Sequence, residues 1–89
     1  MATACKHVDS LGPTEPAPSS TDGCTDCLAI GEHNWAHLRL CLACGRVGCC
    51  DSSPRRHADA HFHTSGHPVM RSFEPGESWR WCYIDQRLV

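Results

Sequence analysis

Residues 41–68 read CLACGRVGCCDSSPRRHADAHFHTSGHP, and this stretch decides the fold. Cysteines crowd its first part and histidines its second; the candidate ligands are Cys41, Cys44, Cys49, Cys50, His57, His61 and His67. Zinc prefers four tetrahedral ligands drawn from thiolate and imidazole, and a CxxC turn offers two thiolates at once. The stretch therefore predicts structural zinc sites.

Three further pairs of candidate ligands lie outside this stretch: Cys24 with Cys27, Cys5 with His7, and Cys82 with Asp85. The first is a second CxxC turn. In the third pair, Cys82 is the only cysteine left that is far along the chain from the others. Asp85 follows it at the spacing of a CxxC turn. Carboxylate oxygen is an acceptable zinc ligand, although it is harder than sulfur. These pairs predict that both ends of the chain take part in metal binding.

The size of the chain favours metal over a large apolar core. It has 89 residues with eight cysteines and seven histidines, and small domains often need metals or disulfides to hold a fold. A disulfide framework would use the cysteines but leave the histidines unexplained. No apolar stretch approaches the roughly 20 residues of a membrane span, and the start lacks the apolar core of a signal peptide. We therefore expect a soluble cytoplasmic zinc domain with reduced thiols and no membrane partner.

The charge pattern argues against nucleic acid as a partner. The formal net charge is −2, and the basic residues are scattered, with Arg55-Arg56 as the only adjacent pair. A surface that binds phosphate backbones should carry a basic stripe. DNA or RNA binding is therefore not predicted.

Three strands are predicted from the hydrophobic pattern. Residues 38–42 alternate with period two, and residues 69–73 and 79–84 flank a turn at 74–77. Residues 8–23 are rich in Pro, Ser and Gly and predict a loop between the first two ligand pairs.

One helix is predicted that begins after Ser53 and continues through residues 57–63. Ser53 can cap it, and Pro54 suits the first helical position. Gly66 and Pro68 then force its end. The sequence thus predicts a few short strands, one helix and long irregular connections.

The order of the motifs, CxH, CxxC, CxxC, CxxxxC, HxxxH, TSGHP and then WCY, resembles the UBP-type zinc finger over residues 5–86. This is the ubiquitin-binding finger of certain deubiquitinases and of a histone deacetylase, and the chain looks closest to its short stand-alone bacterial forms. The resemblance implies one domain over residues 1–89. It also implies a small α+β fold, with a short antiparallel sheet and one main helix, cross-braced by three zinc sites.

The resemblance also implies which residues share each zinc ion. One set is Cys24, Cys27, Cys49 and His57; a second is Cys41, Cys44, His61 and His67; a third is Cys5, His7, Cys82 and Asp85. Spacing alone would send His57 and His61 to a single metal, because they lie one helical turn apart on one face. Cys50 is the alternative to Cys49 in the first set, whereas His33, His37 and His63 are expected to be non-ligands.

The filled zinc sites predict a binding module and not an enzyme. A catalytic zinc keeps an open position for water, whereas each of these sites has four ligands, and no HExxH motif is present. Strand alternation places Trp79, Trp81 and Tyr83 on one face. By resemblance, Trp35, Trp81 and Tyr83 line a pocket that takes the free C-terminal Gly-Gly tail of ubiquitin or a ubiquitin-like protein, and the module is expected to be a monomer.

One departure from the family pattern concerns the carboxylate of that tail. The family has a tail-contacting Arg after the last cysteine of the first site, where this chain has Cys50-Asp51-Ser52. Arg55, Arg56 and Arg46 are the candidate substitutes. Two alternatives stay open: an adaptor that binds another protein through the same aromatic face, and a thiol or zinc redox switch based on the adjacent cysteines.

Overall fold

The computed structural model describes residues 5–9, 11 and 14–89. Its centre is an antiparallel sheet with the strand order β2-β1-β3-β4-β5. The strands are β1 (Leu38–Cys41), β2 (Val47–Cys49), β3 (Val69–Ser72), β4 (Arg80–Cys82) and β5 (Arg87–Leu88). The helices are α1 (Lys6–Asp9), α2 (Thr25–Ala29) and α3 (His57–Ser65). The expected small α+β fold, with a short antiparallel sheet and one main helix, is confirmed.

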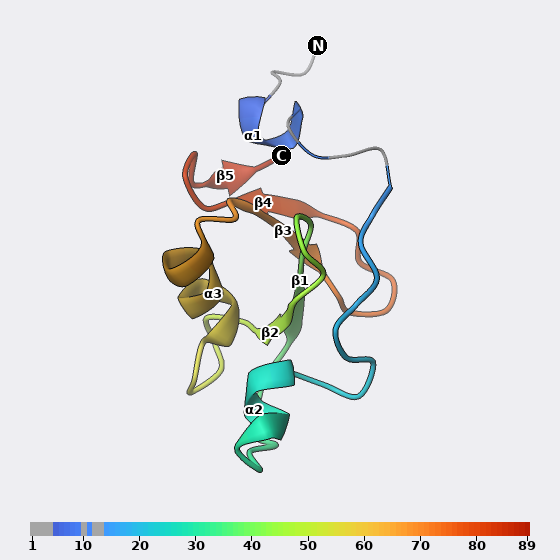
Figure 1. The fold of residues 1–89 in the computed structure, drawn as a ribbon, viewed down its shortest axis with the longest axis vertical. Coiled ribbons are helices and arrows are strands. Elements are labelled where there is room, and N and C mark those ends of the chain that lie inside the picture. The colour runs from blue at the N-terminus through green and yellow to red at the C-terminus, as the bar shows by residue number, and fades with distance from the viewer. Residues whose placement is uncertain (1–4, 10, 12–13) are drawn as a thin grey trace.

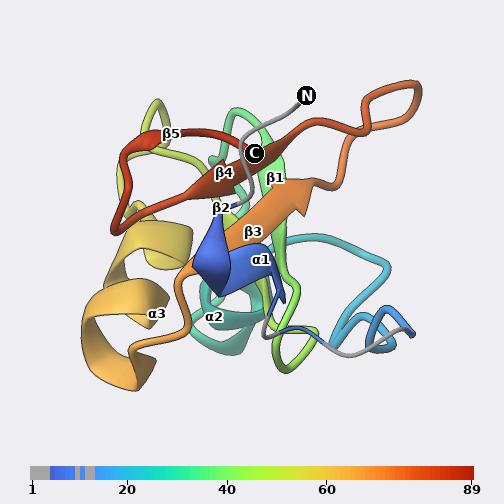
Figure 2. The ribbon, with the colours of Figure 1, turned by 90° about the horizontal axis from the view of Figure 1, so that it is seen from above.

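The strand order runs along the long axis of the molecule, with α1 beside β5 at one end and α2 beside β2 at the other (Figure 1). Figures 1 and 2 both show α3 on one side of the sheet and the segment from α1 to α2 on the other. None of the helices in the described part of the chain is long and apolar enough to cross a membrane.

The strand register decides which side chains share a face. Cys41 pairs with Met70, Met70 pairs with Trp81, and Arg39 pairs with Ser72. Because side chains alternate across a strand, Arg39, Met70 and Trp81 project from one face, toward α3. Gly48 lies at the closest approach of sheet and helix, where a Cβ would meet the Ala58 backbone nitrogen at 2.7 Å.

The opposite face carries the apolar core. Leu40, Val47 and Val69 have fully buried side chains. The N-terminal segment covers them and is anchored by polar contacts: Ser19 donates its N–H to the Gly45 carbonyl at 2.8 Å. Because so few large apolar residues are buried, we expect the fold to depend on its cysteine clusters as well.

The predicted start of α3 is wrong. The helix begins at His57, after Arg56 in a left-handed conformation with φ 45°, and no side chain caps it. Ser53 is instead buried, and its Oγ accepts a hydrogen bond from the Ala36 N–H at 2.8 Å. The predicted end is confirmed, because Gly66 has a φ of 78° and donates its N–H to the Phe62 carbonyl.

The predicted strands correspond to β1, β3 and β4, each somewhat shorter than expected. Tyr83 lies just beyond β4, in a turn that continues to Gln86 with a φ of 53°. Within the predicted loop, Val8 and Asp9 belong to α1, residues 14–23 contain no helix or strand, and residues 10, 12 and 13 lie outside the described residues.

Candidate metal centres and binding pocket

The first set of ligand groups gathers at the α2 end of the sheet. Cys24 precedes α2 and Cys27 lies in its first turn, while Cys49 ends β2 and His57 begins α3. The His57 Nδ1 atom lies 3.2 Å from the Cys24 sulfur, 3.2 Å from the Cys27 sulfur and 3.6 Å from the Cys49 sulfur. All three cysteines are completely buried.

The second set ties the β1–β2 turn to α3. Cys41 ends β1 and Cys44 lies in that turn, while His61 comes from α3 and His67 from the segment that follows it. The Cys41 sulfur lies 3.5 Å from His67 Nδ1, and the Cys44 sulfur lies 3.4 Å from His61 Nε2. Cys44 is exposed, so this set borders solvent.

The third set joins the two ends of the chain. His7 Nδ1 lies 3.5 Å from the Cys5 sulfur, 3.4 Å from the Cys82 sulfur and 3.5 Å from Asp85 Oδ1. Asp85 belongs to the β4–β5 turn, and its N–H points at the Cys82 sulfur, as in a CxxC turn.

These spacings fit tetrahedral zinc. Within each set the four ligand atoms lie within 4.8 Å of one another. With Zn–S near 2.3 Å and Zn–N near 2.0–2.1 Å, the edges of a tetrahedron should be roughly 3.4–3.8 Å. Most of the measured separations fall close to that range, although Cys5 and Asp85 approach more closely, at 2.9 Å. Zinc would serve here as a structural cross-link between separate segments of the chain.

The electrostatics of the first set also fit a bound cation. Burial, reinforced by the neighbouring Cys24 and Cys49 sulfurs, raises the pKa of the Cys27 thiol to about 12. Such a thiol stays protonated at neutral pH unless a cation stabilises the thiolate. A divalent ion would provide that charge at the point where the sulfurs meet.

The structure brings the twelve expected ligand residues together in the same three sets that the resemblance implies. His57 and His61 lie in different sets, contrary to what spacing alone favours. Cys50 lies outside the first set, and its sulfur is 3.7 Å from the Ser53 hydroxyl. His37 lies 3.6 Å from Glu74, and His63 lies 3.4 Å from Asp59, away from these sets.

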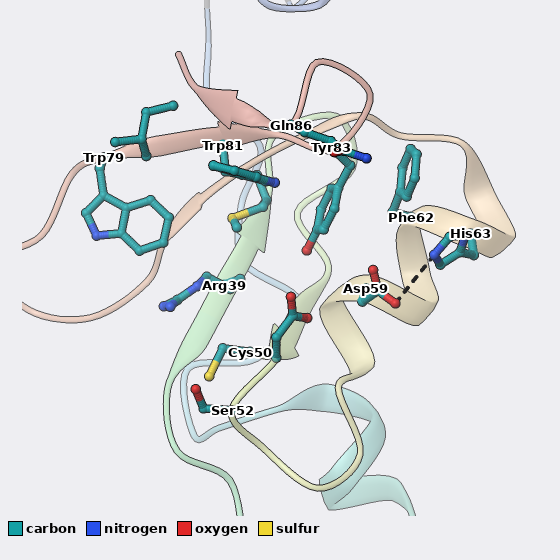
Figure 3. A pocket seen from close by; sticks show the side chains of 13 residues that line it. Arg39, Cys50, Ser52, Asp59, Phe62, His63, Trp79, Trp81, Tyr83 and Gln86 are labelled. Carbon is teal, nitrogen blue, oxygen red and sulfur yellow. Dashed lines mark ion pairs between the residues drawn. The ribbon is translucent and has the colours of Figure 1, made fainter.

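A pocket of about 670 Å³ lies between α3 and the sheet (Figure 3). Its lining comprises Arg39, Cys50, Asp51, Ser52, Asp59, Phe62, His63, Met70, Trp79, Trp81, Tyr83, Gln86 and Leu88. Trp81 and Tyr83, two of the three residues that the resemblance implies for a tail pocket, line this one. Trp35 does not line this pocket, since it packs against the first set of cysteines.

Aromatic rings and one cation shape the pocket. The Phe62 and Tyr83 rings stack with centroids 4.8 Å apart. The Arg39 guanidinium lies over the Trp79 ring, 4.5 Å from its centroid, and donates to the Leu38 carbonyl at 3.0 Å. Burial raises the pKa of Tyr83, and the nearby carboxylates raise it further, so its hydroxyl remains a hydrogen-bond donor.

Sequence reasoning missed Arg39 as the cation of the pocket. The three arginines it considered do not line the pocket: Arg46 pairs with Asp26, and Arg55 lies 3.9 Å from Glu32. The period-two alternation does place Arg39 on the other face of its strand from Leu38 and Leu40. The sequence does not predict the strand pairing that brings Arg39 close to the pocket residues of β3 and β4.

Comparisons with known proteins agree with this geometry. Residues 24–89 match the family described as the zinc finger in ubiquitin hydrolases and other proteins. The solution NMR structure of a protein from Rhodopseudomonas palustris is similar, with 46% sequence identity and a TM-score of 0.85. The match covers 99% of this chain and 82% of that one. No curated protein matches the chain at a significant level.

Proposed function

Since the chain belongs to the family of zinc fingers found in ubiquitin hydrolases and other proteins, we propose that its pocket captures the free C-terminal Gly-Gly tail of ubiquitin or a ubiquitin-like protein. The chain is a zinc-binding module, and each of its three sets offers four ligands. A zinc ion with four protein ligands has no open position for a water nucleophile. The proposed role of the metal is therefore to hold the pocket in shape, and the proposed function is binding without catalysis.

The observation that carries the proposal is an aromatic pocket with an unpaired cation. Among the described residues, no carboxylate forms an ion pair with Arg39. Its guanidinium donates one hydrogen bond to the Leu38 carbonyl. A glycine tail has no side chains and can enter a pocket lined by Trp81 and Tyr83. Its carboxylate needs donors, which the Arg39 guanidinium and the Tyr83 hydroxyl supply.

We further propose that the module works as a monomeric single domain in the cytoplasm, where its thiols stay reduced.

The test is a titration of the zinc-loaded protein with three forms of ubiquitin: intact, lacking the last two glycines, and amidated at the C-terminus. Loss of the charge-assisted carboxylate contact, about 1.5–3 kcal/mol, should weaken binding roughly ten- to a hundredfold. Trp81→Ala should cause a similar loss at unchanged zinc content. Equal affinity for the free and amidated tails would overturn this function and favour the adaptor.

Trp35→Ala belongs in the same series because the structure places Trp35 outside the pocket. A loss of tail affinity at unchanged zinc content would show that the binding surface extends beyond the pocket to the first metal set. A loss of zinc or of stability alone would make Trp35 a packing residue.

A further inference from the structure

The second metal set differs from the other two in its access to solvent. Cys44, in the turn between β1 and β2, is exposed, whereas the other seven cysteines are buried. In the first set all three cysteines are completely buried, and in the third set Cys5 and Cys82 are 3% and 0% exposed. Among the ligand sulfurs, that of Cys44 is therefore the one that a small reagent in solution reaches most directly.

The sulfur beside Cys44 is placed to complete an oxidation that begins there. Cys41 lies three residues earlier, at the end of β1, and the two sulfurs lie within 4.8 Å of each other. CxxC pairs form disulfides in oxidoreductases. Cys41 is buried, but the closing step takes place between neighbouring sulfurs and needs no access from solvent. The second set thus offers one thiolate to meet an oxidant and another to close the disulfide.

The other cysteines do not combine exposure with a neighbouring partner. Cys24 and Cys27 have the same spacing, but both are completely buried. In the third set, Asp85 stands where a CxxC turn would have its second cysteine. The adjacent Cys49 and Cys50, on which the sequence centred a redox role, are buried at 0% and 5% exposed. The CxxC turn of the first set is therefore a matched internal control.

The second set lies next to one wall of the binding pocket. The helix α3 carries ligands of two sets, His57 at its start for the first and His61 in its middle for the second. Phe62 directly follows His61, lines the pocket and stacks on Tyr83 with ring centroids 4.8 Å apart. Without the second set, α3 would keep a metal set at its first residue only. Loss of this zinc ion should therefore loosen the α3 wall of the pocket.

We propose that Cys44 and Cys41 form an oxidation site, at which a peroxide converts the two thiolates into a disulfide, releases the zinc ion of the second set and loosens the α3 wall. The inference does not depend on what the pocket binds. It gives the exposed position of Cys44 a role beyond that of a structural ligand.

The reaction balances with hydrogen peroxide as the oxidant. The Cys44 thiolate attacks one peroxide oxygen, the O–O bond breaks and hydroxide leaves, which gives a sulfenic acid. The Cys41 thiolate then attacks the Cys44 sulfur, so that the S–S bond forms, the S–O bond breaks and a second hydroxide leaves. The two sulfurs together give two electrons to the peroxide. His61 and His67 then remain as the protein ligands, and two imidazoles hold zinc less well than a complete set of four ligands.

The test follows zinc release from the reduced, zinc-loaded protein as hydrogen peroxide is added. A chromogenic chelator too weak to strip zinc from the unoxidised protein reports the released ion, and mass spectrometry after digestion maps the disulfide. Because thiolate oxidation follows exposure, we expect one zinc ion to leave roughly tenfold or more faster than the others, together with a Cys41–Cys44 disulfide. A dithiol reductant followed by zinc should restore the loaded protein.

Two variants locate the reaction. Cys44→His keeps four ligand groups but leaves one thiolate in the set, so it should bind zinc there and lose the fast phase. Cys50→Ser removes the thiol that belongs to no metal set and should keep the fast phase. If Cys44→His loses its zinc on purification, the disulfide map of the unmodified sequence decides between the thiols.

Hydrogen exchange measures the effect on the pocket wall. Peroxide should lower the protection of the α3 amides, whereas α2, which carries Cys27 of the first set, should stay protected. Zinc release without a Cys41–Cys44 disulfide would overturn the oxidation site, as would a first disulfide between Cys24 and Cys27 or loss of all zinc ions at one rate. Unchanged protection of α3 after the disulfide has formed would overturn the link to the pocket.

Discussion

At the scale of single residues, the adjacent Cys49 and Cys50 have different roles. The Cys49 sulfur lies 3.9 Å from that of Cys27 and completes the first set, whereas Cys50 turns toward Ser53. We expect Cys49→Ser to lose one zinc ion and most of the fold, and Cys50→Ser to keep its zinc. Native mass spectrometry counts the ions, and amide dispersion in NMR reports the fold. If Cys50→Ser loses zinc and Cys49→Ser does not, then Cys50 and not Cys49 is the ligand of the first set.

Asp85 gives a second prediction at this scale. Asp85→Ala removes the oxygen ligand from the third set, leaving three protein ligands with water in the fourth position. We expect weaker zinc binding at this site and faster loss of one zinc ion to a chelator, with the other two unaffected. Asp85→Cys should have the opposite effect, because it supplies a softer ligand at the same spacing. Unchanged chelator resistance in both variants would remove Asp85 from the ligands.

Single residues also show how much of the metal sites can be predicted from the sequence alone. The ligand pairs were predictable from their spacing, because the two ligands of a CxxC turn are close in sequence. The division of His57 and His61 between two metals was not, since it depends on which chain segments fold against α3. Arg39 was missed for the same reason: its neighbours in the pocket are set by strand pairing between distant residues.

At the scale of elements, the contact between α3 and β2 depends on Gly48. A Cβ there would lie 2.7 Å from the backbone nitrogen of Ala58 and 2.9 Å from its Cα, so one element must move. We expect Gly48→Ala to lower the free energy of unfolding by about 1–3 kcal/mol, the usual cost of overpacking. Chemical denaturation of the zinc-loaded protein measures it.

A control separates crowding from the general effect of replacing glycine. Gly76 has open space at its Cβ position and a φ of 81°, so Gly76→Ala reports backbone strain in the turn alone. Because α3 carries ligands of two sets, only Gly48→Ala should also speed zinc loss. Zinc loss at the same rate in both variants would contradict this role for the α3–β2 contact.

Elements differ in how far the sequence predicts them. β1, β3 and β4 were predictable because alternation or turn residues mark them. β2 and β5 are too short to show a period, and they exist because neighbouring strands offer hydrogen-bonding edges. The predicted start of α3 was wrong because the Ser53 hydroxyl does not cap the helix. It accepts a hydrogen bond from the Ala36 N–H instead.

At the scale of the whole molecule, the three metal sets follow the long axis. The first lies beside α2, the second ties the β1–β2 turn to α3, and the third lies beside α1 (Figure 1). Each set joins segments that are distant in sequence. The motif resemblance could give this cross-bracing, whereas composition and periodicity could not, because nothing local marks which half-sites meet.

This arrangement predicts that folding depends on metal. The purified protein should carry three zinc ions, and chelation should unfold it, because each structural site contributes on the order of 10 kcal/mol or more. Lowering the pH should release zinc, since protons compete for histidine and cysteine ligands. Elemental analysis and NMR during chelator titration test this. One zinc ion per chain, or a folded chelated protein, would contradict it.

The third set has a mechanical consequence. It connects Cys5 and His7 with Cys82 and Asp85, so tension applied at the two ends of the chain passes β5 and then reaches these metal–ligand bonds before it reaches the other four strands. The zinc ion would act as a clasp that shields the strands from force. In single-molecule pulling, the zinc-loaded protein should show rupture of the third metal site first. The chain between His7 and Cys82 should extend only after that rupture. In Cys5→Ser, where the clasp is broken, the strands should yield at lower force from the start.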